Sequence, residues 1–228
     1  MQDAINKRFF GRRKGRKLSN RSERLLKTLL PKLIFTFSDQ KLDLASNLFC
    51  SKNRPIFLEI GFGYGENIAN LSIKRPEWGF VGFEPYLNGV ASLLNKIDDK
   101  GLSNIRISTE DCRPFIEKIK SNSISEVAIL FPDPWPKKRH ISRRFIQKET
   151  VDQLVRIMKP RGNLVIASDD IGMQKWILSR FLSHNLIRWE AKSPDDWKLI
   201  PNQFSKTRYM EKAEANDRKT AWFSFIKV

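Results

Sequence analysis

IFLEIGFGYG, residues 56 to 65, is the stretch that decides the fold of this chain of 228 residues. Its first five residues form a short apolar run, which is typical of a buried strand. Three glycines at alternate positions, Gly61, Gly63 and Gly65, then predict a tight turn, because glycine adopts backbone conformations that other residues avoid. The next segment has helical spacing up to Pro76. The positive N-terminus of that helix would face a ligand bound at the turn.

Strand-like and helical segments continue to alternate after this unit. The helical segments repeat apolar side chains at i, i+3, i+4 and i+7, as at Val90, Leu93, Leu94 and Ile97. Further strand-like runs are GFVGFE, NIRIST, VAILF, LVIAS, LIRWE and AWFSFI, at residues 79–84, 104–109, 127–131, 164–168, 186–190 and 221–226. This alternation predicts an α/β fold: a Rossmann-like, doubly wound, mainly parallel seven-stranded sheet with helices on both faces. The length favours one domain over residues 21 to 228.

The chain is strongly basic, with 42 Lys and Arg against 25 Asp and Glu and a formal net charge of +17. An excess of this size indicates a phosphate-rich partner, because net charge governs partners and solubility rather than fold. Residues 1 to 20 offer little apolar surface to bury, so we predict a disordered arm there. Its basic residues, from Lys7 to Arg21, are expected to contact RNA phosphates. A solvated tail without function is the alternative.

The sequence has no feature of a secreted or membrane protein. Its first residues lack the apolar core of a secretory signal, and no apolar run reaches the roughly 20 residues of a membrane-spanning helix. The two cysteines and two histidines show no metal-binding spacing. We therefore expect a cytoplasmic protein without a metal, a membrane partner or an obligatory protein partner.

Acidic residues stand at the ends of three successive predicted strands. Glu59 precedes Gly61 by two residues, Glu84 ends the second strand and Asp111 follows the third. Because parallel strands end at one edge of a sheet, we expect these acids and the glycine turn, Gly61 and Gly63, to form one ligand site. The ammonium, ribose and adenine of S-adenosylmethionine suit three such acids. Helix caps or solvated acids are the alternatives, and an NAD site is disfavoured by the acid before a G-x-G-x-G turn.

The segment FPDPWPKKRH, residues 131 to 140, follows the fourth predicted strand. Prolines on both sides of Asp133 restrict the backbone and fix where its carboxylate points. Six Lys or Arg and no acid occur from Lys137 to Lys148, which favours a grip on RNA phosphates over a solvated helix face. Trp135 is equally consistent with stacking on a base and with packing in the core.

These segments resemble the bacterial tRNA (guanine-N7)-methyltransferases. The resemblance rests on LEIGFGYGE, FVGFEPY, EDC, LFPDPWPKKRHISRRF, MKPRGNLVIASDD and TRYMEKA, and it extends from about Leu58 to Ala213. It implies methyl transfer from S-adenosylmethionine to N7 of a guanine, at position 46 in the variable loop of tRNA. By position it also implies that the cofactor is held by Glu59, Gly61, Gly63, Glu84, Asp111 and Asp133.

The resemblance implies further roles at the substrate side. Asp133 matches the active-site carboxylate, and the substrate contacts match Lys137, Asp169, Thr207, Arg208, Tyr209 and Met210. This chain departs from the family at one position, because Met210 stands where the family usually has glutamate. Glu211 follows one residue later.

The residues agree with chemistry at N7 of guanine. N7 already carries a lone pair, so no general base is needed, and the motif has no His–carboxylate pair or activated nucleophile. One alternative is a methyltransferase for exocyclic amines, but those enzymes carry Asp/Asn-Pro-Pro-aromatic where this chain has Asp133-Pro134-Trp135-Pro136. The other is an RNA-binding protein on a methyltransferase-like fold, which would not bind S-adenosylmethionine.

Overall fold

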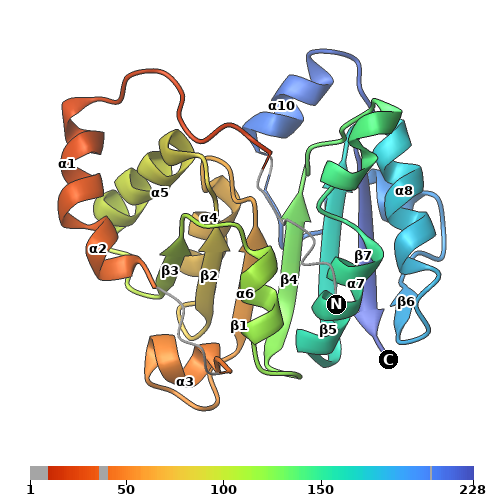
Figure 1. Ribbon diagram of the computed structural model, residues 1–228, viewed down its shortest axis with the longest axis horizontal. Coiled ribbons are helices and arrows are strands. Elements are labelled where there is room, and N and C mark those ends of the chain that lie inside the picture. The colour runs from red at the N-terminus through yellow and green to blue at the C-terminus, as the bar shows by residue number, and fades with distance from the viewer. Residues whose placement is uncertain (1–9, 36–40, 206) are drawn as a thin grey trace, which may run out of the picture.

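Seven strands form one sheet at the centre of the protein (Figure 1). The structure, a computed structural model, describes residues 10–35, 41–205 and 207–228. The strand order is β3-β2-β1-β4-β5-β7-β6. The first five strands pair in parallel, and β7 pairs antiparallel with β5 and β6, which confirms the predicted mainly parallel sheet. The strands are β1 (Ile56–Ile60), β2 (Gly79–Phe83), β3 (Ile105–Ser108), β4 (Ile124–Leu130), β5 (Met158–Ser168), β6 (Ile187–Trp189) and β7 (Ala221–Lys227).

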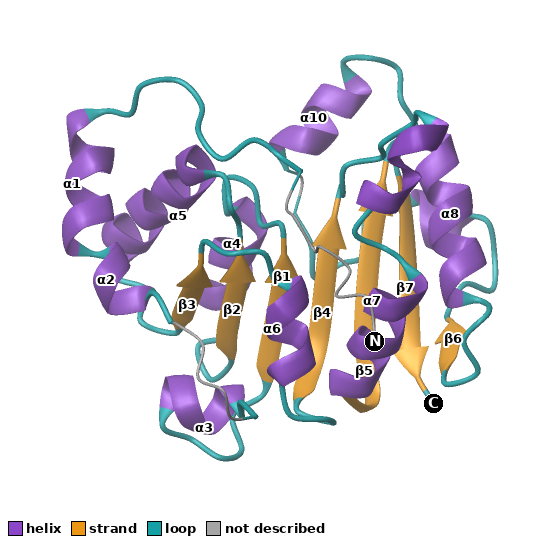
Figure 2. Ribbon diagram, in the orientation of Figure 1, coloured by secondary structure: helices purple, strands orange, loops and turns teal. Residues whose placement is uncertain are grey.

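Helices cover both faces of the sheet (Figure 2). Alternate residues of a strand point to opposite faces, so Leu58 of β1 enters one hydrophobic core and Phe57 enters the other. The core around Leu58 is covered by α3 (Leu44–Phe49), α6 (Arg113–Lys118), α7 (Lys148–Ile157), α8 (Ile171–Phe181) and α9 (Asp195–Lys198). The core around Phe57 is covered by α1 (Asn20–Thr28), α2 (Leu30–Leu33), α4 (Glu66–Lys74), α5 (Leu87–Lys100) and α10 (Arg208–Glu214).

Helix α5 shows how the sequence spacing becomes structure. The four residues at helical spacing, Val90, Leu93, Leu94 and Ile97, are all buried. The helix ends at Gly101, whose φ of 61° is open to glycine at little cost. Within the described ranges, no helix combines the length and the apolar character needed to cross a membrane.

Residues 10 to 19 form a coil that runs along the N-terminal end of α5. The N–H of Leu87, in the first turn of α5, donates to the carbonyl of Arg13 (2.9 Å). The Asn88 side chain accepts from the N–H of Gly15 (2.8 Å) and donates to the carbonyl one residue further on (2.7 Å). The first N–H groups of a helix have no partner within it. The coil therefore caps α5 from outside.

These contacts give residues 10 to 19 partners on α5, which the expectation of a disordered arm over residues 1 to 20 did not include. The coil is held because its backbone satisfies donors of α5, a constraint that composition does not reveal. Lys7 and Arg8, with the rest of residues 1–9, lie outside the described residues. The division into an arm and one domain stays a prediction.

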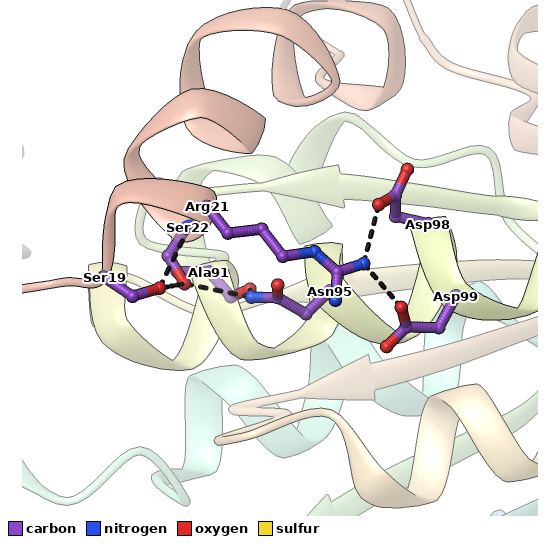
Figure 3. A network of polar contacts seen from close by, with 7 residues as sticks. All are labelled: Ser19, Arg21, Ser22, Ala91, Asn95, Asp98 and Asp99. Carbon is purple, nitrogen blue, oxygen red and sulfur yellow. Dashed lines mark hydrogen bonds and ion pairs between the residues drawn. The ribbon is translucent and has the colours of Figure 1, made fainter.

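Helix α1 is docked on α5 by a polar network (Figure 3). Asn95 of α5 donates to the hydroxyl of Ser22 (3.0 Å). Arg21 donates to Asp98 (2.7 Å) and also to Asp99. Arg21 was predicted to contact RNA phosphates. Two carboxylates of the protein hold its guanidinium, which is still partly exposed, so the phosphate contact stays a prediction.

Candidate active site

A pocket of about 410 Å³ opens at the carboxyl ends of the parallel strands. Its wall consists mainly of the segments that follow β1, β2, β3 and β4, with residues 10 to 12 and part of α10. The strand order reverses between β1 and β4, which is where doubly wound sheets bind their ligands. The predicted residues in this wall are Gly61, Glu84, Asp111, Asp133 and Tyr209.

Glu84 is held by the backbone on both sides. One carboxylate oxygen accepts from the N–H of Gly63 (2.8 Å) and the other from the N–H of Tyr86 (2.9 Å). Burial raises the pKa of Glu84, the two hydrogen bonds act to lower it, and the charge of Asp133 raises it further. A carboxylate has about four lone-pair sites. Glu84 can therefore hold the glycine turn and still accept hydrogen bonds from a ligand.

Glu59 lies beneath the pocket rather than in its wall. Its carboxylate accepts from the side-chain amide of Asn67 on α4 (3.0 Å). Burial raises the pKa of Glu59 to about 8, although the Asn67 hydrogen bond acts to lower it. The predicted direct contact between Glu59 and the cofactor stays a prediction.

The glycine turn provides backbone groups rather than side chains. Gly61 and Gly63 have φ angles of 74° and 55°, the left-handed region that glycine adopts most easily. A Cβ at Gly63 would lie 2.9 Å from the ring of Tyr209. Gly61 is in the pocket wall and Gly63 is not. The turn therefore places Gly61 in the pocket wall and leaves room for Tyr209 beside Gly63.

Asp111 is fixed by Arg113, which sequence reasoning did not single out. One carboxylate oxygen of Asp111 accepts from the Arg113 guanidinium (2.7 Å) and the other from its backbone N–H (3.0 Å). The same guanidinium donates to the carbonyl of Arg143 (3.4 Å). Arg113 therefore links the end of β3 to the segment that follows β4.

The segment after β4 carries Asp133 to the pocket in an unusual backbone conformation. Phe131 and Trp135 have φ angles of 54° and 40°, a region that costs a non-glycine residue about 1 kcal/mol or more. Asp133 lies between them, in the pocket wall and exposed to solvent. Its surroundings raise the pKa of Asp133 through partial desolvation. The site therefore contains a carboxylate on a conformationally constrained loop.

Trp135 already has several protein partners. Its ring meets the edge of His140 at 5.6 Å and of Phe10 at 6.5 Å between centroids. The guanidinium of Arg143 lies over it at 5.1 Å, and also 5.0 Å from the ring of Phe10. Trp135 lies in the pocket wall as well. The question of base stacking or packing stays open.

The predicted substrate residues are only partly brought to the pocket. Tyr209 is in the wall and stacks on Phe131, with centroids 6.1 Å apart. Burial, with the charge of Glu84 next, raises the pKa of Tyr209 to about 12. Three others lie outside the wall: Arg208 is over the ring of Tyr64 (4.9 Å), Lys137 is exposed, and Asp169 pairs with Arg218 (2.7 Å).

Met210 does not reach the pocket. Helix α10 turns one face to the sheet, so Thr207, Met210 and Ala213, spaced three apart, are all buried. Met210 packs in the same core as Trp222, and the neighbouring Glu211 is exposed. The Met210 side chain therefore lies in the core rather than in the pocket wall, and its assignment to the substrate stays a prediction. The hydroxyl of Thr207 is buried without a hydrogen-bond partner in the described part of the chain.

The basic run from Lys137 to Lys148 divides into two groups. Lys137, Lys138 and Arg139 are exposed at the start of a 3₁₀ helix, η1 (Lys138–Arg143). Lys148 instead pairs with Asp152 (2.8 Å). Arg144 is buried and donates to protein carbonyls. Arg144 therefore lacks the exposure that a phosphate contact requires, whereas Lys137, Lys138, Arg139 and Lys148 have it, and their contact with RNA stays a prediction.

Sequence reasoning missed several pocket residues. Most of them flank the predicted acids and glycines in the sequence, whereas Phe10, Gly11 and Arg12 come from the N-terminal coil and Arg143 from η1. The missed residues are Phe10, Gly11, Arg12, Tyr64, Tyr86, Glu110, Cys112, Arg113, Phe131 and Arg143. Among the described residues, no cluster of three or more His, Cys, Asp or Glu is placed to hold a metal ion.

Solved structures share this fold. An rRNA methylase from Streptococcus thermophilus superposes with a TM-score of 0.53 and 12% identity, over 77% of this chain and 88% of that one. An antibiotic-related methyltransferase gives 0.53 and 17% identity, over 85% and 96%. A family model described as "putative methyltransferase" matches residues 53–222. The fold is thus that of a Rossmann-like methyltransferase.

Relatives with similar sequences identify the family within the methyltransferases. A protein of Rhodospirillum rubrum named tRNA (guanine-N(7)-)-methyltransferase is 39% identical over 222 residues, which cover 96% of this chain and 87% of the relative. A protein of the same name from Agrobacterium fabrum is 38% identical over 226 residues, covering 96% and 94%. The chain belongs to the tRNA (guanine-N(7)-)-methyltransferase family.

Proposed function

We propose that this protein transfers the methyl group of S-adenosylmethionine to N7 of a guanine in tRNA, at position 46 of the variable loop. The observation that carries the proposal is the likeness along 96% of the chain to relatives named for this reaction. The pocket supports it, because carboxylates from three strand ends meet there beside a glycine turn.

The pocket residues fit the cofactor S-adenosylmethionine. Glu84 lies in the pocket wall and keeps lone pairs that the protein does not use, so it suits the ribose hydroxyls. Asp111 suits the adenine amino group, and Gly61 brings its backbone close to the amino-acid end. When bound, the cofactor supplies an electrophilic methyl group on a positively charged sulfur.

The residues of the chain have two tasks in the transfer. The N7 lone pair attacks the methyl carbon while the bond from that carbon to sulfur breaks, so no proton leaves N7. Asp133 accepts hydrogen bonds from N1–H and the 2-amino group of guanine, which orients the ring. Its negative charge also stabilises the positive charge that develops on the ring. Tyr209 and Phe131, stacked at the wall, supply an aromatic surface for the base.

The tRNA backbone is bound by exposed basic residues around the pocket. Lys137, Lys138 and Arg139 lie just after the Asp133 loop. The described part of the N-terminal coil adds Lys14 and Lys17, both exposed. Phosphate contacts of this kind depend strongly on salt concentration. A tRNA substrate also places the protein in the cytoplasm.

One experiment tests the proposal. Unmodified tRNA is incubated with the protein and S-adenosylmethionine labelled in the methyl group, and the nucleosides are then identified by mass. We expect 7-methylguanosine, and no label in a matched tRNA in which that guanine is replaced by adenine. A label on an exocyclic amine would favour the rival methyltransferase. Failure of S-adenosylmethionine to bind in calorimetry would favour an RNA-binding protein.

A further inference from the structure

Arg144 lies directly behind the loop that carries Asp133. Its Nε donates to the carbonyl of Pro134 (2.8 Å), and a terminal nitrogen donates to the carbonyl of Trp135 (3.5 Å). The residue is 7% exposed. The planar, rigid guanidinium of Arg144 thus donates to two successive carbonyls on the C-terminal side of Asp133.

Arg144 is itself held in place by helix α8. Its guanidinium lies over the ring of Trp176 at 4.9 Å. The indole N–H of Trp176 donates to the carbonyl of Ile146 (2.6 Å). Trp176 therefore supports the Arg144 guanidinium and also holds the backbone two residues further along the chain, at Ile146.

These contacts explain how a costly backbone conformation persists. Phe131 and Trp135, on the two sides of Asp133, both have left-handed φ angles, and such residues keep them only when their surroundings enforce it. At one end the N–H of Phe131 donates to the carbonyl of Ala167 on β5 (2.9 Å). At the other end the restraint comes from Arg144.

We propose that Arg144 is a positioning residue that acts through Asp133: by holding the carbonyls of Pro134 and Trp135, it aims the Asp133 carboxylate into the pocket. The proposal rests on the proposed function of the site. It assigns to Arg144 a geometric task rather than a contact with RNA, because the guanidinium is buried and its donors face the loop.

The test compares Arg144→Lys and Arg144→Ala with the wild-type protein in the tRNA methylation assay. Lysine keeps the positive charge but loses the planar fork, so it isolates geometry if the alanine variant does not fold. We expect kcat to fall roughly 100-fold for alanine, the scale of a misplacement of about 1 Å, and roughly 10-fold for lysine. KM for tRNA and Kd for S-adenosylmethionine should stay within about threefold. A raised KM with unchanged kcat would make Arg144 a substrate contact and overturn the proposal.

A double-mutant cycle asks whether Arg144 acts through Asp133. In an Asp133→Asn background, Arg144→Lys should lower kcat by less than about threefold, because residues that act as a unit are not additive. Additive losses would mean that Arg144 acts independently of Asp133, and the proposal would be wrong.

Arg156 provides a matched control near the amino ends of β4 and β5, opposite to the pocket. It is also partly buried and donates to the carbonyls of Ile119 and Ile116, both at 2.7 Å. Arg156→Lys should lower the melting temperature but leave kcat within about twofold, since it lies far from the site. An equal loss of kcat in both lysine variants would reduce the effect of Arg144 to general destabilisation. If the wild-type protein itself forms no 7-methylguanosine, the proposed function fails instead.

Discussion

The substitution Glu84→Gln should damage both the glycine turn and cofactor binding. The Glu84 carboxylate accepts from the N–H of Gly63 at 2.8 Å and from the N–H of Tyr86 at 2.9 Å. Glutamine has nearly the same shape but only one oxygen. Its amide nitrogen would face one of the two N–H groups, so one charge-assisted hydrogen bond is lost and the other is weakened.

The size of the effect follows from these contacts. A hydrogen bond to a charged group contributes about 1.5–3 kcal/mol to stability. Burial raises the pKa of Glu84, because it disfavours the charged form of the carboxylate. The neutral amide of glutamine avoids this cost and so recovers part of the lost stability. We therefore expect a decrease of about 1.5–2 kcal/mol in the free energy of unfolding, or roughly 3–8 °C in melting temperature.

The loss in cofactor affinity adds to this destabilisation. If Glu84 accepts hydrogen bonds from the ribose, replacing its charge should weaken S-adenosylmethionine binding by about 1.5–3 kcal/mol, or roughly 10- to 100-fold in Kd. Thermal melts without ligand measure the first effect, and isothermal titration calorimetry measures the second. Glu66→Gln is the control, because it removes a charge from the first turn of α4 and lies outside the pocket wall.

Two outcomes would contradict this reasoning in different places. Wild-type cofactor affinity in a destabilised Glu84→Gln protein would show that Glu84 only supports the turn. An unchanged melting temperature would show that the two backbone hydrogen bonds contribute little to stability. Equal effects in Glu66→Gln would point to net charge rather than to the contacts of Glu84.

Further predictions concern the other carboxylates and the coil. Asp133→Asn should keep the fold and lower single-turnover methyl transfer roughly 100-fold, the scale of losing one aimed polar group; a loss of tRNA affinity alone would refute the electrostatic role. Glu59 has a native pKa of about 8 against 4.5 ordinarily, so the folded state binds the extra proton. Stability should then fall by up to about 1.4 kcal/mol per pH unit as pH rises from about 5 to 8. In Glu59→Gln melts this fall should be absent, and the variant should melt above the wild type at pH 9. Replacing Lys14 and Lys17 by Gln should reduce the slope of log K against log salt by roughly 1.4–1.8, and an unchanged slope would remove the coil from the RNA interface.

The sequence allowed the sheet and the pocket acids to be predicted because both depend on local pattern. The run IFLEI and the three glycines are contiguous, and the parallel topology alone brings Glu84, Asp111 and Asp133 to one edge. Position along a strand was therefore enough to place them together. This rule did not place Tyr209, which was assigned to the pocket only through the family motif, since α10 comes from a distant part of the chain.

The contacts that the sequence did not reveal are those that depend on which way a side chain points. Met210 was assigned from its motif position, yet the face that α10 turns to the sheet buries it. Arg144 belongs to a one-sign charge run in the sequence, yet the chain returns inward there and the guanidinium meets two carbonyls. Arg21 pairs with acids almost eighty residues away. A local sequence pattern cannot reveal contacts of this kind.

The position of β7 sets the order in which this protein can be completed. β7 is the last strand along the chain but lies between β5 and β6 in the sheet. In the described part of the chain, β6 pairs with no other strand. During synthesis, the 11-residue strand β5 thus keeps an open edge until residues 221–227 leave the ribosome. An open edge recruits other strands and invites aggregation. The nascent enzyme therefore depends on residues 221–227 to close its own sheet, and a chain released just before Ala221 should be a substrate for chaperones and proteases.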